Sequence, residues 1–246
     1  MLRYEMMLPH QIRTAIEKRW PVILPLGVLE YHGEHLPVGM DTLAVTGILE
    51  ILEKEKDLVI LPHSTTAPRA MRSSRRKAMG IAAGRRRGSL ALRQGDVSRP
   101  ARIGFRNIHV VIHHQTENFA AGMPTDLAFK FAGRQAIFAF LEKDRGEGWW
   151  GSNEMADYYA RQSAGEDPFN WIKTHPLMTP GAMEGYPYDH AGKGETSLMM
   201  ALFPDAVDLS RLSDEKWYVR SAKDASLEFG ARGRDRILAH LRVALR

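Results

Sequence analysis

Acidic and imidazole side chains follow an apolar segment near the start of the chain. Residues 21–27 (PVILPLG) predict a buried strand, and the loop after it contains Glu30, His32, Glu34, His35 and Asp41. In an open α/β sheet, loops at the carboxyl ends of the strands bind ligands. Oxygen and imidazole donors, in a chain without cysteine, suit zinc, manganese or iron(II). The pattern predicts a metal site, and a solvated polar loop is the alternative.

A second group of polar residues follows another apolar segment, residues 107–112. It comprises His113, His114, Gln115 and Glu117 and ends at Asn118. Because parallel strands end at one edge of a sheet, we expect this group to lie beside the first. A carboxylate from it would complete a metal site. The alternative is that both histidines are ordinary core or surface residues.

A third segment places Asp189 and His190 shortly before Glu195, Thr196 and Ser197. A histidine beside a carboxylate can transfer protons near neutral pH. The same residues also suit the start of a helix, where Glu195 would interact favourably with the helix dipole. This segment alone is therefore weak evidence for catalysis.

The elements that must position these residues alternate between helix and strand. We expect helices near 12–20, 42–54, 124–143, 195–202 and 235–245, with strands at 21–27, 58–61 and 107–112. Asp41 stands at the expected N-cap of the second element. On the helix near 124–143 the core candidates are Leu127, Phe129, Phe131, Ala136, Ile137, Phe138 and Leu141. This order predicts one α/β domain over 1–246, with a mainly parallel sheet covered by helices on both faces.

Residues 64–101 interrupt this order. Eleven of the 34 Lys and Arg residues lie between Arg69 and Arg102, with Asp96 as the single acid there, so the remainder of the chain is net acidic. The segment lacks periodicity of either kind and is rich in Arg, Ala, Gly and Ser. Out-of-frame translation of codons rich in G and C gives this composition. We therefore expect a shifted reading frame that is restored near Arg102.

Together the three polar segments resemble the creatininase (creatinine amidohydrolase) family. That family has Glu-x-His-Gly-x-His-Leu-Pro, matched from Glu30, and an Asp nine residues after its first His, matched by Asp41. It also has His-Ala-Gly-x-x-Glu-Thr-Ser, matched by residues 190–197, and Asn-Gly-His-x-x-Asn, matched loosely by 113–118. The resemblance implies a three-layer α/β/α hydrolase with two divalent metal ions. It also implies a homo-oligomer that opens cyclic amides or cleaves related C–N bonds.

Position by position, the resemblance assigns metal ligands. Glu30, His32 and Asp41 would bind the ions, with Asp41 bridging them, and Glu117 would be a further ligand. The family's central His falls on Gln115, so either the Gln115 amide oxygen or the neighbouring His114 would complete the set.

The resemblance also assigns catalytic residues. His190 would be the proton shuttle, oriented by Glu195, and Asp189 stands where creatininase has Glu. Aromatic pocket walls would come from the region of Trp149, Trp150 and Trp171, although these could equally be core residues.

The substrate class stays open between a cyclic amide and a keto-cyclitol. Residues 113–118 look more similar to a family branch that hydrolyses 3-dehydro-scyllo-inosose. The physical requirement is common to both substrates, because a ring carbonyl must be polarised and attacked by metal-activated water.

Two alternatives are an inactive family relative and a nucleic-acid-binding protein that uses the basic stretch 69–102. Residues 64–102 contain no Phe, Tyr or Trp to stack on bases, which disfavours nucleic acid. The charged N-terminal segment and the lack of a long apolar run predict a cytoplasmic protein without a membrane partner.

Overall fold

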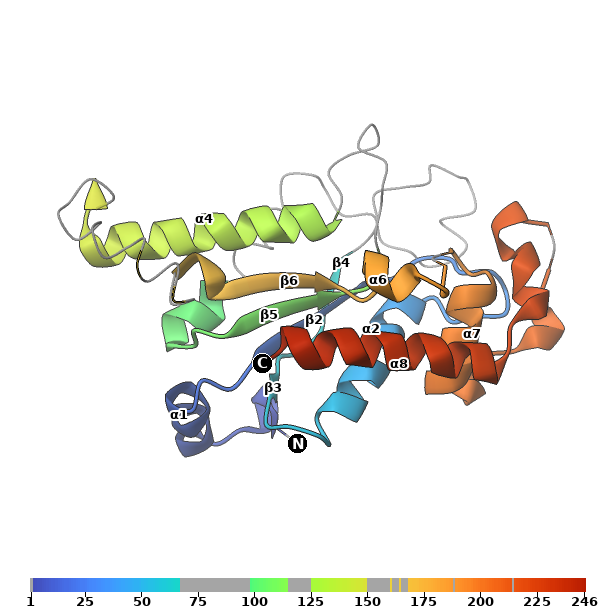
Figure 1. Ribbon diagram of the computed structural model, residues 1–246, viewed down its shortest axis with the longest axis horizontal. Helices are drawn as coiled ribbons and strands as arrows, with labels where there is room; N and C mark the ends of the chain where they lie inside the picture. Colours follow the sequence, from blue (N-terminus) through green and yellow to red (C-terminus); the bar gives the residue numbers. More distant parts are fainter. Residues whose placement is uncertain are drawn as a thin grey trace.

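A parallel β-sheet forms the centre of the molecule (Figure 1). The computed structural model describes residues 2–66, 98–114, 125–149, 160, 164, 168–187, 189–213 and 215–246. Within these residues the strands are β1 (Leu2–Arg3), β2 (Val22–Val28), β3 (Val59–Ile60), β4 (Ser64–Thr66), β5 (Ile108–Ile112) and β6 (Ile172–Pro176). Their order is β1-β3-β2-β5-β6, and β4 pairs with β2 beyond β3. Every pairing is parallel.

Helices cover both faces of the sheet, as its alternating side chains require. On one face, Ile23 and Val111 pack against α2 (Met40–Leu52), α7 (Lys193–Leu202) and α8 (Leu227–Ala244). On the other face, Leu24 and Val110 pack against α4 (Thr125–Arg145). Figure 1 shows α4 and α8 on opposite sides of β5 and β6. The structure is the predicted α/β fold with three layers.

Shorter elements complete the layers. α1 (Pro9–Glu17) and the helical residues 98–103 pack at the amino end of β2, β3 and β5. The remaining short helices are η1 (Tyr4–Met6), η5 (Pro168–Asn170), α6 (Pro180–Met183), η6 (Pro204–Ala206), η7 (Leu209–Arg211) and η8 (Trp217–Asp224). No helix of the described part of the chain is long and apolar enough to cross a membrane.

Several sequence predictions need correction. Asp41 is not the N-cap of α2, because Gly39 takes that position and Asp41 lies inside the first turn. The last helix begins at Leu227 rather than near residue 235. On α4, Leu127, Phe131 and Phe138 are exposed rather than in the core. A helix lying on a sheet buries only one face, and these three side chains lie on the other.

The anomalous segment is described only at its ends. Residues 67–97 lie outside the described residues, so most of the predicted frame-shifted stretch does too. Residues 64–66 pair with β2 and residues 98–103 are helical, so the predicted loss of regular structure is wrong at both ends.

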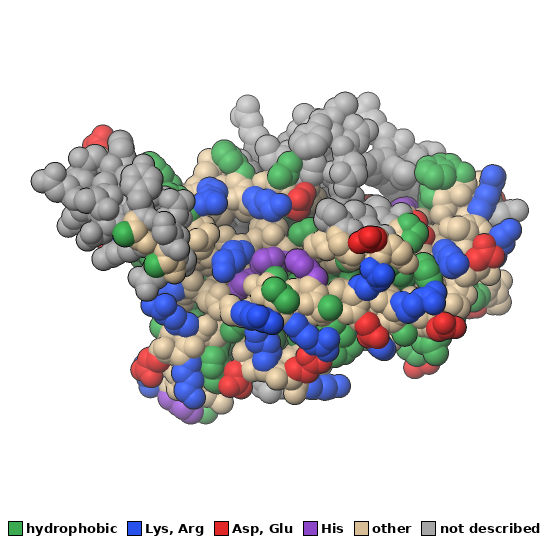
Figure 2. Space-filling view, viewed as in Figure 1, with side chains coloured by type: hydrophobic (Ala, Val, Ile, Leu, Met, Phe, Trp, Pro, Cys, Tyr) green, Lys and Arg blue, Asp and Glu red, His purple; other side chains and the backbone are tan. Residues whose placement is uncertain are grey.

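A group of histidines lies between β5, β6 and α8. Nδ1 of His109 lies 2.9 Å from Nε2 of His175, and Nε2 of His109 lies 2.8 Å from Oδ1 of Asn107. The ring of His240 on α8 is 6.3 Å from that of His175. In Figure 2 histidine side chains gather near the middle of this face, with Lys and Arg side chains around them. Because Asn107 accepts from Nε2 of His109, Nδ1 of His109 accepts from His175, and this contact requires neutral imidazoles.

Candidate metal centre

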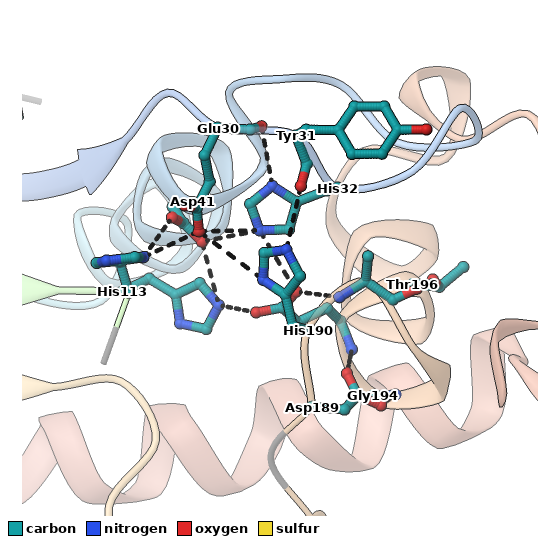
Figure 3. Close-up of polar contacts among 12 residues, drawn as sticks. Glu30, Tyr31, His32, Asp41, His113, Asp189, His190, Gly194 and Thr196 are labelled. Atoms are coloured by element: carbon teal, nitrogen blue, oxygen red, sulfur yellow. Dashed lines mark hydrogen bonds and ion pairs between the residues drawn. The ribbon is translucent and has the colours of Figure 1, made fainter. Parts of the chain in front are cut away.

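The polar residues predicted from sequence converge at the carboxyl edge of the sheet (Figure 3). β2 ends at Val28, and the loop after it presents Glu30 and His32. Asp41 comes from the first turn of α2. His113 and His114 follow β5, the neighbour of β2, so parallel pairing brings both loops to the same edge.

Two sets of potential ligand atoms share Asp41. In one, Nδ1 of His114 lies 3.0 Å from Oε1 of Glu30 and 3.5 Å from Oδ2 of Asp41. In the other, Nε2 of His32 lies 3.4 Å from Oδ1 of Asp41 and 3.5 Å from Oε2 of Glu195. Asp41 therefore offers one carboxylate oxygen to each set. A third set, Glu30 with His32 and His190, overlaps the other two.

The donor atoms fit divalent cations. His32, Asp41 and Glu195 are almost completely buried. Nε2 of His32 and Oδ2 of Asp41 are buried without a hydrogen-bond partner among the described residues. Burial of such groups is costly unless they are paired or bind a metal. Imidazole and carboxylate donors at these separations suit a zinc, manganese or iron(II) ion in each of the two sets.

The charges of the cluster shift its pKa values strongly. Burial alone would lower the pKa of His32, but Asp41 and Glu195 raise it to about 9. Burial acts in the same direction on His114, and Asp41 and Glu30 raise its pKa to about 10. The facing imidazoles hold the pKa of Asp41 well below its usual range, although burial opposes this. The carboxylates thus create a negative potential that protons or metal cations can neutralise.

His190 lies at the more open side of this cluster. Its side chain is 32% exposed, and its ring packs on that of His32 with centroids 4.4 Å apart. Nε2 lies 3.1 Å from the carbonyl oxygen of Tyr31, and Nδ1 lies 3.8 Å from Oε1 of Glu30. On its other side the ring meets the ring of Tyr218. His190 therefore borders the cluster and also reaches solvent.

Asp189 and Glu195 differ from their predicted roles. The Asp189 carboxylate accepts the backbone N–H groups of Gly194, at 2.6 Å, and of Glu195, at 3.0 Å. These are donors from the first turn of α7, so Asp189 caps the helix rather than joining the cluster. Glu195 contacts His32 and His113 and belongs to one ligand set. Sequence analysis placed Glu195 beside the proton shuttle, although its buried carboxylate at a strand-end cluster is equally typical of a ligand.

The second polar segment is described only in part. Gln115 and Glu117 lie outside the described residues, whereas His114 lies in the cluster. With His114 in the place of the family's central His, the motif shifts by one residue, and its Gly falls on His113.

The tryptophans that the structure describes are core residues. Trp149 is buried with Ile137 and Leu141 of α4. Trp171 precedes β6, at the opposite edge of the sheet, where it packs on Arg106 and Phe140. Their predicted role as pocket walls is therefore wrong, because α4 and the end of the sheet bury these rings. Trp150 lies outside the described residues.

The fold and the cluster define a class of protein: a three-layer α/β protein with a candidate dinuclear metal centre at the carboxyl edge of its sheet. A family model described as "Creatininase: Creatinine amidohydrolase" matches residues 5–237. The chain belongs to the creatininase family.

Solved structures share the fold at low sequence identity. A structure titled "Creatininase Mn" is 17% identical and has a TM-score of 0.70, with 100% of this chain and 97% of that chain covered. A mutant creatininase complexed with creatine is 18% identical, with a TM-score of 0.68 and coverage of 99% and 96%. A putative creatinine amidohydrolase from Bacteroides fragilis NCTC 9343 is 20% identical, with a TM-score of 0.62 and coverage of 99% and 94%. No curated protein matches the sequence.

Proposed function

We propose that this protein is a metal-dependent hydrolase that opens a small cyclic substrate. The observation that carries the proposal is the position of Asp41, whose two oxygens face two separate sets of ligand atoms. Similar solved structures include one titled with manganese and one titled "Zn-Zn type", which supports two divalent ions. When bound, such ions would polarise a carbonyl group and lower the pKa of a water molecule.

The proposed ligands follow from the two sets. Glu30 and His114 would hold one ion and His32 and Glu195 the other, with Asp41 bridging them. His114 is preferred to Gln115 because its Nδ1 is within reach of both carboxylates of its set. Glu117 is kept as a further proposed ligand on the family resemblance alone.

His190 is proposed to move the proton. With Nε2–H donated to the carbonyl oxygen of Tyr31, the lone pair of Nδ1 faces the cluster beside Glu30. An imidazole in this position can accept a proton from the attacking water and return it to the leaving atom. The capping contacts of Asp189 assign it to holding the start of α7, and with it Glu195.

A cyclic amide is the substrate class we propose. The family model is that of creatinine amidohydrolase, and one similar structure is a mutant creatininase complexed with creatine. A keto-cyclitol is the second class, because residues 113–118 depart from the amidohydrolase motif. Both substrates present a ring carbonyl to the cluster.

The test is a substrate panel with purified protein of defined metal content. Lactams, including creatinine, and keto-cyclitols such as 3-dehydro-scyllo-inosose are incubated with the protein as isolated, after chelation, and after return of zinc or manganese. Ring opening of one class, lost on chelation and regained with metal, supports the proposal. Two bound ions with no ring opening would favour an inactive relative. Salt-sensitive binding of DNA with no metal content would favour a nucleic-acid-binding protein.

A further inference from the structure

His113 lies directly behind the carboxylate of Glu195 and is fully buried. Its Nε2 is 2.9 Å from Oε1 of Glu195 and 3.8 Å from Oδ1 of Asp41. The first distance is that of a hydrogen bond, and the second is too long for one. None of the three ligand sets found among the described residues includes His113. Its contact is therefore with a proposed ligand rather than within a ligand set.

The second oxygen of Glu195 is held from a different segment. The backbone N–H of Ala191 donates to Oε2 of Glu195 at 2.7 Å. Ala191 has a φ of +55°, a conformation that residues with a β-carbon adopt rarely and that clusters at functional sites. With one hydrogen bond on each oxygen, the carboxylate of Glu195 cannot rotate without losing a partner.

This fixed orientation presents Oε2 of Glu195 to His32. The two atoms are 3.5 Å apart, and Oε2 has a further lone pair beyond the one used by Ala191. Hydrogen bonds from residues behind a ligating carboxylate orient it, and their loss typically reduces metal affinity about 10–100-fold. The other set, which contains Glu30 and His114, has no printed contact with His113.

We infer that His113 is a positioning residue, which orients Glu195 and so sets the affinity of the ion at His32, Asp41 and Glu195. The ion at Glu30, Asp41 and His114 does not depend on it in this way. The inference rests on the proposed two-ion function and adds to it a difference between the two ions.

Two amide variants separate orientation from general packing. In His113→Gln the amide nitrogen is as many bonds from the β-carbon as Nε2 of histidine, so it can still donate to Glu195. In His113→Asn the amide is one bond shorter and cannot reach. His109→Gln is the matched control, because His109 is equally buried and hydrogen-bonded on the same β5 edge but contacts His175 and Asn107.

Zinc binding to each folded variant is measured by equilibrium dialysis with elemental analysis, and folding by circular dichroism. We expect two ions in the wild type, in His113→Gln and in His109→Gln. His113→Asn should retain one ion with unchanged affinity and bind the other about 10–100-fold more weakly.

Other outcomes overturn the inference in distinguishable ways. Two ions bound normally by His113→Asn would refute the positioning role while leaving the proposed function intact. Equal weakening of both ions, an equal loss in His113→Gln or His109→Gln, or failure of His113→Asn alone to fold would show a general structural role. A wild-type protein that binds no ion would refute the proposed function, and the inference with it.

Discussion

At the scale of single residues, Asp41 has the most central position in the cluster. It is the residue common to both ligand sets formed by Glu30 with His114 and by His32 with Glu195. Its burial and its depressed pKa keep it charged without any direct hydrogen bond to Oδ2 among the described residues. A bridging carboxylate in this position would be needed by both ions at once.

Replacement of Asp41 by Ala should therefore remove both ions, not one. Glu34→Ala is a matched control, because this acid lies in the same loop but accepts its hydrogen bond from Tyr31 at 2.8 Å and is exposed. Elemental analysis of the two purified variants checks the prediction. Full metal content in Asp41→Ala would show that Asp41 does not bridge.

His190 should affect turnover more than metal content. It borders the cluster, but the sets that share Asp41 are complete without it. General acid–base groups contribute about 10²–10⁴-fold, so His190→Ala should lower kcat by that factor while both ions stay bound. Steady-state kinetics beside elemental analysis separates the two effects. A variant with unchanged kcat would exclude the proton-transfer role.

At the scale of elements, α7 and α8 approach so closely that their contact depends on glycine. A β-carbon at Gly230 of α8 would lie 1.8 Å from the carbonyl oxygen of Ser197 in α7. Ser197 is two residues from Glu195, so the position of α8 is linked to the metal centre. Helix propensity alone favours Ala over Gly by about 1 kcal/mol, but a backbone clash of this kind forces one helix to move.

Gly230→Ala should thus destabilise the protein despite its better helix propensity. Gly181→Ala in α6 is the comparison, because a β-carbon there would meet no atom within 4 Å. Thermal unfolding should show a lower Tm for Gly230→Ala and little change for Gly181→Ala. A Tm for Gly230→Ala at or above that of the wild type would mean that α8 tolerates the displacement.

The histidines between β5, β6 and α8 predict a loss of stability in acid. Burial lowers the pKa of His109 to about 3 and that of His175 to about 4, from 6.5, with nearby positive charges acting in the same direction. The positive groups that contribute are Lys56, Lys130, Lys173 and His240. Since the unfolded chain binds these protons more readily, stability is complete above pH 6.5 and falls as the pH drops toward 4.

Urea unfolding at pH 7.5 and pH 5 measures this loss. His175→Gln removes one titrating group of the pair and should reduce the difference between the two pH values. His10→Gln is the control, because His10 is exposed on α1. An unchanged difference in His175→Gln would place the acid sensitivity elsewhere in the molecule.

The elements were predictable where apolar periodicity was strong. β2 is buried along its whole length and α2 has a continuous apolar face, and both were predicted within a few residues. β1 and β3 have two residues each, and β6 contains Lys and Pro, so only their pairing defines them as strands. In the site, spacing gave Glu30, His32 and Asp41. The contact of Glu195 with His32 depends on how α7 packs, which no local pattern contains.

At the scale of the whole molecule, residues 64–101 remain the feature to explain. We propose that a one-nucleotide shift of the reading frame produced most of this stretch. β4 pairs with β2 at residues 64–66, directly before the part that lies outside the described residues. A core-forming strand and helix encoded in the restored frame would supply further cover for the sheet.

Resequencing of the gene over residues 64–101 tests this proposal. We expect a single-nucleotide difference, after which the translated segment shows alternating apolar residues followed by a pattern with a helical period. The protein made from the restored frame should also have a higher Tm than the present chain, since domains are stable by only about 5–15 kcal/mol. A confirmed sequence in which neither other frame gives such a pattern would refute the proposal.

The cluster draws its side chains from three distant parts of the chain, and this sets a time for its assembly. Glu30 and Glu195 are separated by 165 positions, with His113 and His114 between them. At roughly 5–20 residues per second, a ribosome delivers Glu195 about 10–30 s after Glu30. Throughout that interval the nascent chain exposes acidic and imidazole groups without their last partner. The centre therefore belongs to the final stage of synthesis, when α7 and α8 can close over the sheet.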